Sequence, residues 1–327
     1  MAILTGALRD PAGVHATAAR ARPIGGMERC RPDRATTPAV RFLVAMLRPA
    51  IAVTMLVAWL PAGAGCGAAV PLPRLAIELN AAGARAIADG DLSVAEARLS
   101  VALEYSPRFV EAWVNLGYVE LRRSNFDQAR RDLLKARDLN PDMPTPHHAL
   151  GVLADEQGLG GEAERQYRAA LKVDPGFAPA RANLARRLFA RGQYENAREQ
   201  FERLIEVAPN TVEGWVGDAE ALRQLGRGAQ AASIVARAVD RFGLEPPLRL
   251  LVAREDIERG EWDEAEAVLA PVVGGTDRGR AGAAWAWIAV ARIGHGNVDG
   301  AGDAARASLA IDAHDAVARY ALEQTGK

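Results

Sequence analysis

The stretch "WVNLGYVELRRSNFDQARRDLLKARDLNP", residues 113–141, shows how the whole chain is built. It begins with Trp113, has a glycine at Gly117 and an alanine at Ala129, and ends with a proline. Steps of 34 residues along the chain connect that proline, Pro141, with three others: Pro107, Pro175 and Pro209. The stretch is therefore one copy of a repeated unit.

The same interval holds at other positions of the unit. Twelve residues before each proline lies an alanine: Ala95, Ala129, Ala163 and Ala197. Eight residues before each proline lies a large apolar or aromatic residue: Leu99, Leu133, Tyr167 and Phe201. The register continues without the proline, with a two-residue slip before its last copy: Ala231 with Val235, Ala265 with Leu269, and Ala301 with Ala305. Seven copies are predicted, starting near Ala76, Val110, Pro144, Ala178, Val212, Pro246 and Gly282.

Each copy has the pattern of a helical hairpin. Two runs of about a dozen residues carry apolar side chains at three- and four-residue spacing, which is typical of amphipathic helices. A glycine, or a serine at Ser124, lies between the runs and marks a turn. The closing proline cannot continue the second helix, because it has no amide hydrogen and its ring clashes with the preceding turn. One such hairpin cannot bury its apolar face alone, so the pattern predicts stacked hairpins and a polar cap at the end, "DAVARYALEQTGK".

These residues resemble the tetratricopeptide repeat family, whose pattern is W-x2-L-G-x2-Y, then A-x3-F, then P, at 34 residues. Trp113, Leu116 and Gly117 match the pattern, whereas Glu120 stands where it has tyrosine. The resemblance covers residues 76–315. It implies an all-α fold over residues 76–327, a right-handed superhelical solenoid of seven helix-turn-helix units plus a C-terminal capping helix.

In this family the first helix of each hairpin lines a concave groove that binds other proteins. The resemblance therefore implies a peptide-binding groove, for which the candidate residues are Tyr118, Arg122, Asn115, His148, Asn183, Arg186 and Phe189. Further along, the same positions become more charged, with Glu213, Glu220, Arg223, Arg254 and Glu258. Apolar anchors with flanking charges suit a bound peptide or amphipathic helix of a partner protein.

The N-terminal region has the features of an export signal. No charge lies between Arg48 and Arg74, and the apolar run "AIAVTMLVAWL" is shorter than a membrane span of roughly 20 residues. If synthesis starts at Met46, residues 46–66 resemble a bacterial lipoprotein signal that ends in a lipidated Cys66. An uncleaved membrane anchor and cleavage at the small-residue site "AGA" remain alternatives.

All three alternatives place the repeats outside the cytoplasm, because arginines before the apolar run stay inside. The expected location is the outer membrane or periplasm of a bacterium, with membrane attachment through the lipid or the apolar segment. Residues 1–45 are interpreted as a disordered tail or an overlong gene start, and residues 67–75 as a linker.

Composition and motifs argue against an enzyme or a nucleic-acid-binding protein. The 327 residues have a net charge of -1, and the eight arginines against three acids in residues 1–48 leave -6 for the remainder. Both cysteines, Cys30 and Cys66, precede the repeats, so the repeats contain no disulfide. Adjacent His147 and His148 point about 100° apart on a helix and do not share a metal. Carboxylates on second helices are expected on polar outer faces: Glu162, Glu164, Glu195 and Glu199.

No cofactor, metal, small-molecule substrate or nucleic acid is therefore predicted. The leading hypothesis is a non-enzymatic scaffold that binds proteins of the cell envelope. One alternative is an assembly factor resembling the repeat-containing pilotin lipoproteins of secretin and pilus systems. The other is a regulatory or substrate-presenting module for a separately encoded enzyme.

Overall fold

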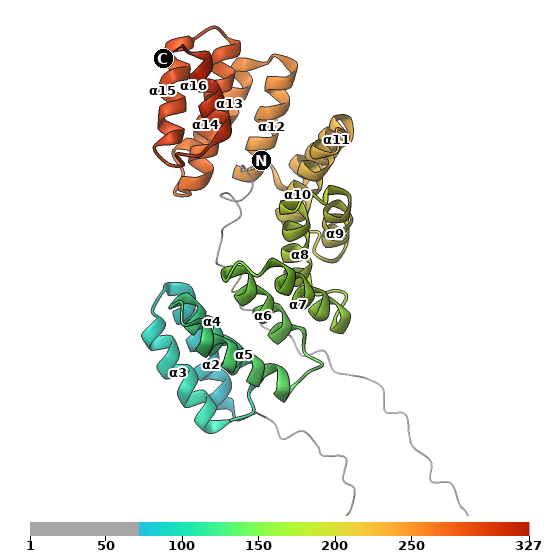
Figure 1. Cartoon of the computed structure of the whole chain (residues 1–327), viewed down its shortest axis with the longest axis vertical. Helices are drawn as coiled ribbons and strands as arrows, with labels where there is room; N and C mark the ends of the chain where they lie inside the picture. Colours follow the sequence, from blue (N-terminus) through green and yellow to red (C-terminus); the bar gives the residue numbers. More distant parts are fainter. Residues whose placement is uncertain (1–71, 327) are drawn as a thin grey trace, which may run out of the picture. The chain divides into compact units, whose positions relative to one another are not determined.

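A computed structural model describes residues 72–326, in which the chain forms fifteen helices and no strand (Figure 1). The helices are α2 (Arg74–Asp89), α3 (Leu92–Tyr105), α4 (Val110–Arg122), α5 (Phe126–Leu139), α6 (Pro144–Glu156), α7 (Gly160–Val173), α8 (Ala178–Ala190), α9 (Tyr194–Val207), α10 (Val212–Gln224), α11 (Gly228–Phe242), α12 (Pro246–Arg259), α13 (Trp262–Val273), α14 (Arg278–Gly294), α15 (Val298–Leu309) and α16 (Ala316–Gln324). Helices α2 to α15 follow one another as hairpins. The all-α solenoid predicted from the repeats is confirmed.

The turn inside each hairpin has a left-handed residue at the predicted break. Six glycines adopt positive φ there: Gly90, Gly158, Gly192, Gly226, Gly260 and Gly296. Between α4 and α5 the same place is taken by Ser124, with φ 61°, the sole non-glycine residue of positive φ in the described part of the chain. Glycine has no Cβ and enters this region without steric cost, so it ends the first helix readily.

Replacing Ser124 with glycine is expected to stabilise the protein. The left-handed backbone costs a residue with a Cβ on the order of 1 kcal/mol, so Ser124→Gly should raise the free energy of unfolding by up to about 1 kcal/mol. The matched control is Ser100→Gly, at an exposed position within α3, which should lower stability instead. Thermal melting of the three proteins measures both effects, and a lower melting temperature for both variants would contradict the assignment of strain to Ser124.

The two helices of a hairpin approach each other closely at small residues. A Cβ placed on Gly117 of α4 would lie 2.6 Å from Leu133 Cδ2 of α5. The approach between hairpins can be as close, since a Cβ on Gly217 of α10 would lie 2.3 Å from Phe201 Cε1 of α9, the last helix of the preceding hairpin. Ala129 of α5 is fully buried in an apolar cluster that includes residues of α4 and α6. The predicted role of these small residues, which is to let helices pack closely, is confirmed.

Neighbouring hairpins share their core. Leu99 of α3 and Phe109 and Val119 of the following hairpin belong to one apolar cluster, and each first helix also contacts the next one, as α2 contacts α4. At the C-terminal end α16 packs against α14 and α15. It covers the last hairpin, in the place predicted for a cap.

The predicted starts of the units agree with the helices in the middle of the array. Five of them are the first residues of α4, α6, α8, α10 and α12. Helix α2 begins at Arg74, two residues before the predicted start. Helix α14 begins at Arg278, so the predicted start at Gly282 was four residues late. The reason is local, because the Asp277 side chain caps α14 by accepting a hydrogen bond of 2.9 Å from the Arg280 amide.

The predictions for residues 1–71, including the segment 46–66 and Cys66, lie outside the residues that the structure describes. Within residues 72–326, none of the helices combines the length and the apolar character that crossing a bilayer requires.

Candidate functional site

Four of the predicted groove residues form one chain of polar contacts across the first helices α4, α6 and α8. His148 Nδ1 lies 3.3 Å from the Tyr118 hydroxyl, and His148 Nε2 lies 3.0 Å from the Asn183 amide nitrogen. Arg186 donates to the Asn183 side-chain oxygen, and its Nε lies 3.4 Å from a Glu213 carboxylate oxygen on α10. The chain therefore connects three successive hairpins and reaches a fourth.

The histidine at the centre of this chain is neutral at physiological pH. Burial and the positive charge of Arg186 lower the pKa of His148 to about 4. An amide NH2 group only donates, so His148 Nε2 accepts from Asn183 and the ring proton is assigned to Nδ1, facing Tyr118. Burial also raises the pKa of the Tyr118 hydroxyl above its usual range. Both side chains thus contact each other between neighbouring first helices. His148 was predicted to face the inner surface, and its side chain is buried there.

The other predicted residues differ in how much they expose. Arg122, the last residue of α4, is exposed. Asn115 is half-buried and donates to the Asn80 side-chain oxygen of α2 at 2.8 Å. Phe189 is half-buried, and its ring packs edge-on against that of Tyr194 at a centroid distance of 5.1 Å. Among the seven candidates, Arg122 is therefore the most accessible to a partner.

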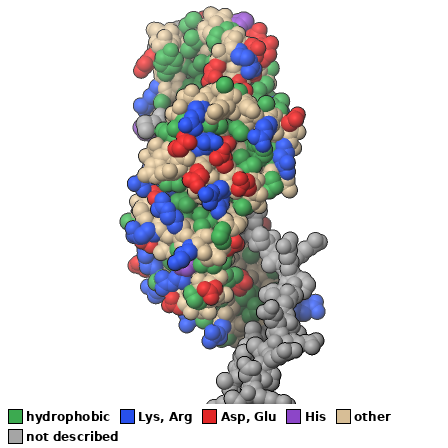
Figure 2. All heavy atoms as spheres, turned by 90° about the vertical axis from the view of Figure 1, so that its right-hand side faces the viewer, with side chains coloured by type: hydrophobic (Ala, Val, Ile, Leu, Met, Phe, Trp, Pro, Cys, Tyr) green, Lys and Arg blue, Asp and Glu red, His purple; other side chains and the backbone are tan. Residues whose placement is uncertain are grey.

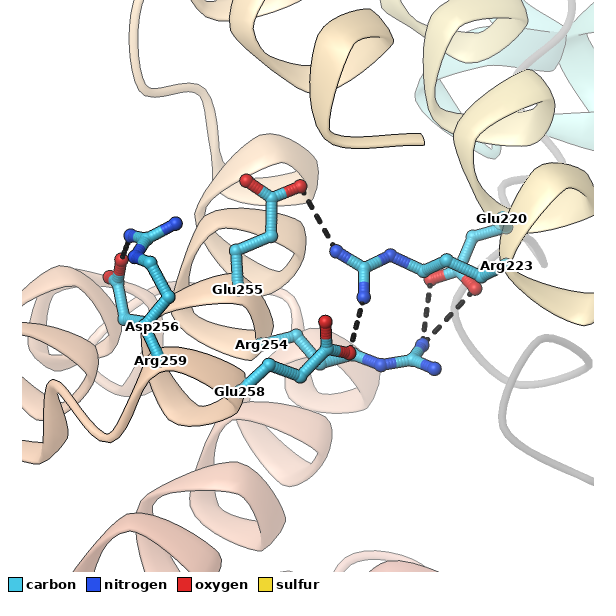
Figure 3. A network of polar contacts seen from close by, with 7 residues as sticks. All are labelled: Glu220, Arg223, Arg254, Glu255, Asp256, Glu258 and Arg259. Carbon is cyan, nitrogen blue, oxygen red and sulfur yellow. Dashed lines mark hydrogen bonds and ion pairs between the residues drawn. The ribbon is translucent and has the colours of Figure 1, made fainter. Parts of the chain in front are cut away.

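Charged side chains continue the row on α10 and α12 (Figure 3). Arg223, whose side chain is 5% exposed, donates to Glu255 at 3.0 Å and to Glu258 at 2.7 Å. Arg254 donates to Glu220 at 3.2 Å, the shorter of its two contacts with that carboxylate. Glu220, Arg223, Arg254 and Glu258 had been predicted to lie along the groove, but Glu255 and the pairing of these charges had not. Opposite charges about one repeat apart were a usable signal for it.

One predicted surface carboxylate is buried. Glu164 was expected on the polar outer face of α7, but it is enclosed by Arg191, at 2.6 Å, and Arg168, at 3.2 Å. That prediction was wrong because Arg191, which follows the next first helix, closes over the carboxylate. Asp132 of α5 is also buried, and burial raises its pKa to about 6.

The described surface has no segregation of charge by sign on the side that Figure 2 shows. Acidic and basic side chains are interspersed there among apolar ones. Within residues 72–326, no group of histidine, cysteine or acidic residues is arranged to hold a metal ion.

Two segments match models of the tetratricopeptide repeat, residues 80–144 and residues 156–215. Over 102 residues the chain is 31% identical to the type IV pilus assembly protein PilF of Pseudomonas aeruginosa. The aligned region covers 31% of this chain and 39% of that protein. Over 92 residues it is 33% identical to tetratricopeptide repeat protein 8 of Mus musculus. That region covers 28% of this chain and 17% of the mouse protein. The matches thus span less than half the length of these relatives.

Solved structures share the fold. The structure of a tetratricopeptide repeat protein of Parabacteroides merdae aligns over 100% of its own chain with 78% of this chain, with a TM-score of 0.56 and 18% identity. The structure of Pseudomonas aeruginosa PilF matches 67% of this chain and 97% of its own, with a TM-score of 0.55 and 20% identity. At these identities the likeness concerns the fold.

Proposed function

Because the chain is a tetratricopeptide-repeat protein, we propose that it is an exported, lipid-anchored and non-enzymatic scaffold of a bacterial envelope. Its partner is a peptide or helix of another protein, held against the first helices. The observation that carries this proposal is the row of polar side chains that links α4, α6, α8 and α10. Such links fix each first helix relative to the next, and a preorganised surface loses less conformational freedom on binding.

The sharper form of the proposal is an assembly factor for a pilus or secretin system. The sequence similarity to a protein named for type IV pilus assembly supports it, as does the lipoprotein-like sequence of residues 46–66. The repeats are the part of the chain that would contact the assembling partner.

A charge exchange on the first helices tests where the partner binds. Arg122 and Glu156 are exposed residues at the ends of α4 and α6, so Arg122→Glu with Glu156→Arg changes this surface and keeps the net charge. We expect the variant to lose its envelope partners in affinity purification after crosslinking, with losses of about 2 kcal/mol or more at a true hot spot. Folding should be kept, since exposed substitutions usually change stability by no more than about 0.5 kcal/mol.

The matched control carries the same exchange on second helices, Arg131→Glu with Glu199→Arg, at exposed positions of α5 and α9. It should recover the same partners as the wild type. Loss of partners in the control alone would move the binding surface to the second helices.

Lipidation is tested at Cys66. We expect radioactive palmitate to label the wild-type protein in the native host and not the Cys66→Ser variant, because that thiol is the acceptor in a lipoprotein signal. Stable anchoring needs more than one acyl chain, so the variant should also leave the membrane fraction. Equal labelling of both proteins would remove the lipoprotein assignment and leave the scaffold proposal standing.

A further inference from the structure

We propose that the open end of the array, formed by α2 and α3, is a docking surface for a second copy of this chain. This end face comprises exposed apolar side chains, together with half-buried Leu79: Leu72, Leu75, Leu79, Val94, Val101 and Tyr105.

On α2 the end face has an apolar side chain whose counterpart in the next hairpin is buried. Phe109, one repeat after Leu75, is 4% exposed because it packs into the core shared with the first hairpin, whereas Leu75 is 45% exposed. Leu79 and Trp113, its counterpart one repeat later, both pack against that core. Leu75 therefore occupies a position that is buried between hairpins one repeat later, whereas in the first hairpin it is exposed.

On α3 the end face carries valine at two positions that are polar in most later hairpins. Val94 and Val101 are 48% and 36% exposed, and Tyr105 is 53% exposed. Their spacing places them on one side of the helix. One and two repeats later, the position of Val94 is taken by Gln128 and Glu162, and one and three repeats later that of Val101 is taken by Lys135 and Arg203. The first hairpin alone among these carries valine at both places.

The apolar rows of α2 and α3 lie on the same side of the hairpin. Two repeats after Leu79 and Arg98, the equivalent residues His147 and Gln166 contact each other at 3.2 Å. Three repeats after them, Arg181 and Gln200 are hydrogen bonded at 2.9 Å. The corresponding positions of α2 and α3 are thus adjacent, and the two rows make one continuous face.

The two ends of the array differ in their cover. At the C-terminal end α16 buries Ala318 and Ala321 against the last hairpin and exposes Arg319, Glu323 and one large apolar side chain, Tyr320. Repeat arrays need polar outer faces at their ends to stay soluble. At the α2 and α3 end, Leu75, Val94, Val101 and Tyr105 leave an apolar surface that a partner would cover.

The occupant follows from the chain before Leu72. This step rests on the proposed function, in which residues 46–66 are removed or held in the membrane, leaving five residues, 67–71, after Cys66. Five residues form little more than one helical turn and cannot cover a two-helix face. Arg98 and Glu104, both exposed on α3, bring both signs of charge to this surface. A copy related by a two-fold axis can pair both signs, whereas an anionic bilayer attracts only the basic ones.

The association is tested with the full chain in a non-ionic detergent by analytical ultracentrifugation over a dilution series. The wild type should sediment as a concentration-dependent dimer. Val94→Glu with Val101→Glu should raise the dimer Kd by about a hundredfold or more, because the symmetric interface would bring carboxylates of both copies together. Leu159→Glu with Val298→Glu changes two equally exposed apolar residues elsewhere and should dimerise like the wild type. Circular dichroism confirms that both variants remain helical.

A wild type that stays monomeric throughout the series would overturn the proposal, which includes the case where the chain's own N-terminal segment covers the face. A Val94→Glu, Val101→Glu variant that still dimerises would overturn it as well. Palmitate labelling reports separately on Cys66. If the chain is not lipidated but still forms a dimer that depends on Val94 and Val101, the lipid anchor at Cys66 is refuted and the docking surface on α2 and α3 is supported.

Discussion

Ala129→Arg is expected to lower the free energy of unfolding by about 3–5 kcal/mol, the usual cost of an uncompensated buried charge. Ala129 has no exposed surface and lies where α4 and α5 are in closest contact. Its carbonyl oxygen is 3.5 Å from the point where a Cβ on Gly117 would lie, so the two helices run close together at this residue. Arginine must either bury its guanidinium or separate the two helices.

Urea denaturation followed by circular dichroism measures this loss. The control is Ala97→Arg, which adds the same side chain at an exposed alanine of α3 and should change stability by no more than about 0.5 kcal/mol. Equal midpoints for the two variants would show that Ala129 does not face its partner helix, and the repeat register would be wrong.

Gly217→Val is expected to lower the free energy of unfolding by about 1–3 kcal/mol through overpacking. A Cβ at Gly217 would lie within 2.5 Å of three atoms of the Phe201 ring, which is itself only 2% exposed. The ring has no solvent-exposed position to move into, so α9 and α10 must separate. Gly228→Val, at an open position at the start of α11, is the control and should have little effect.

A double variant makes the cause specific. Phe201→Ala removes the ring that Gly217→Val would strike, so the penalty for Gly217→Val should shrink in that background, an interaction that a double-mutant cycle measures. A penalty of the same size with and without Phe201 would place the clash elsewhere.

The repeat register could be predicted from the sequence because it depends on local steric demands. Prolines after second helices, small residues such as Gly117 and Ala129, and the break at Ser124 recur at one interval, and each has a role within its own hairpin. Ser124 shows how strongly the turn is imposed, since the backbone becomes left-handed there without a glycine. The late start predicted for the last hairpin at Gly282 had a local cause that the repeat pattern does not contain, the side-chain cap at Asp277.

Contacts between hairpins were less accessible to sequence reasoning. Tyr118 had been predicted as a residue of the peptide-binding groove, and its hydroxyl contacts His148 on the next first helix. Glu164 had been placed on an outer face, yet Arg191 from the following hairpin encloses it. Both outcomes depend on which side chains the neighbouring hairpin presents. A single repeat fixes where a residue lies on its helix, and only the stacked neighbour decides whether it remains exposed.

Photo-crosslinking in the native host is the most direct test of the proposal that a partner protein is held on the first helices. A photoreactive phenylalanine derivative would replace Arg122, the exposed candidate at the end of α4, and in a second strain Arg131, exposed on α5. We predict a discrete crosslinked product of higher mass from position 122 and none from position 131. Products from position 131 alone, or from neither position in cells that produce the folded protein, would contradict it.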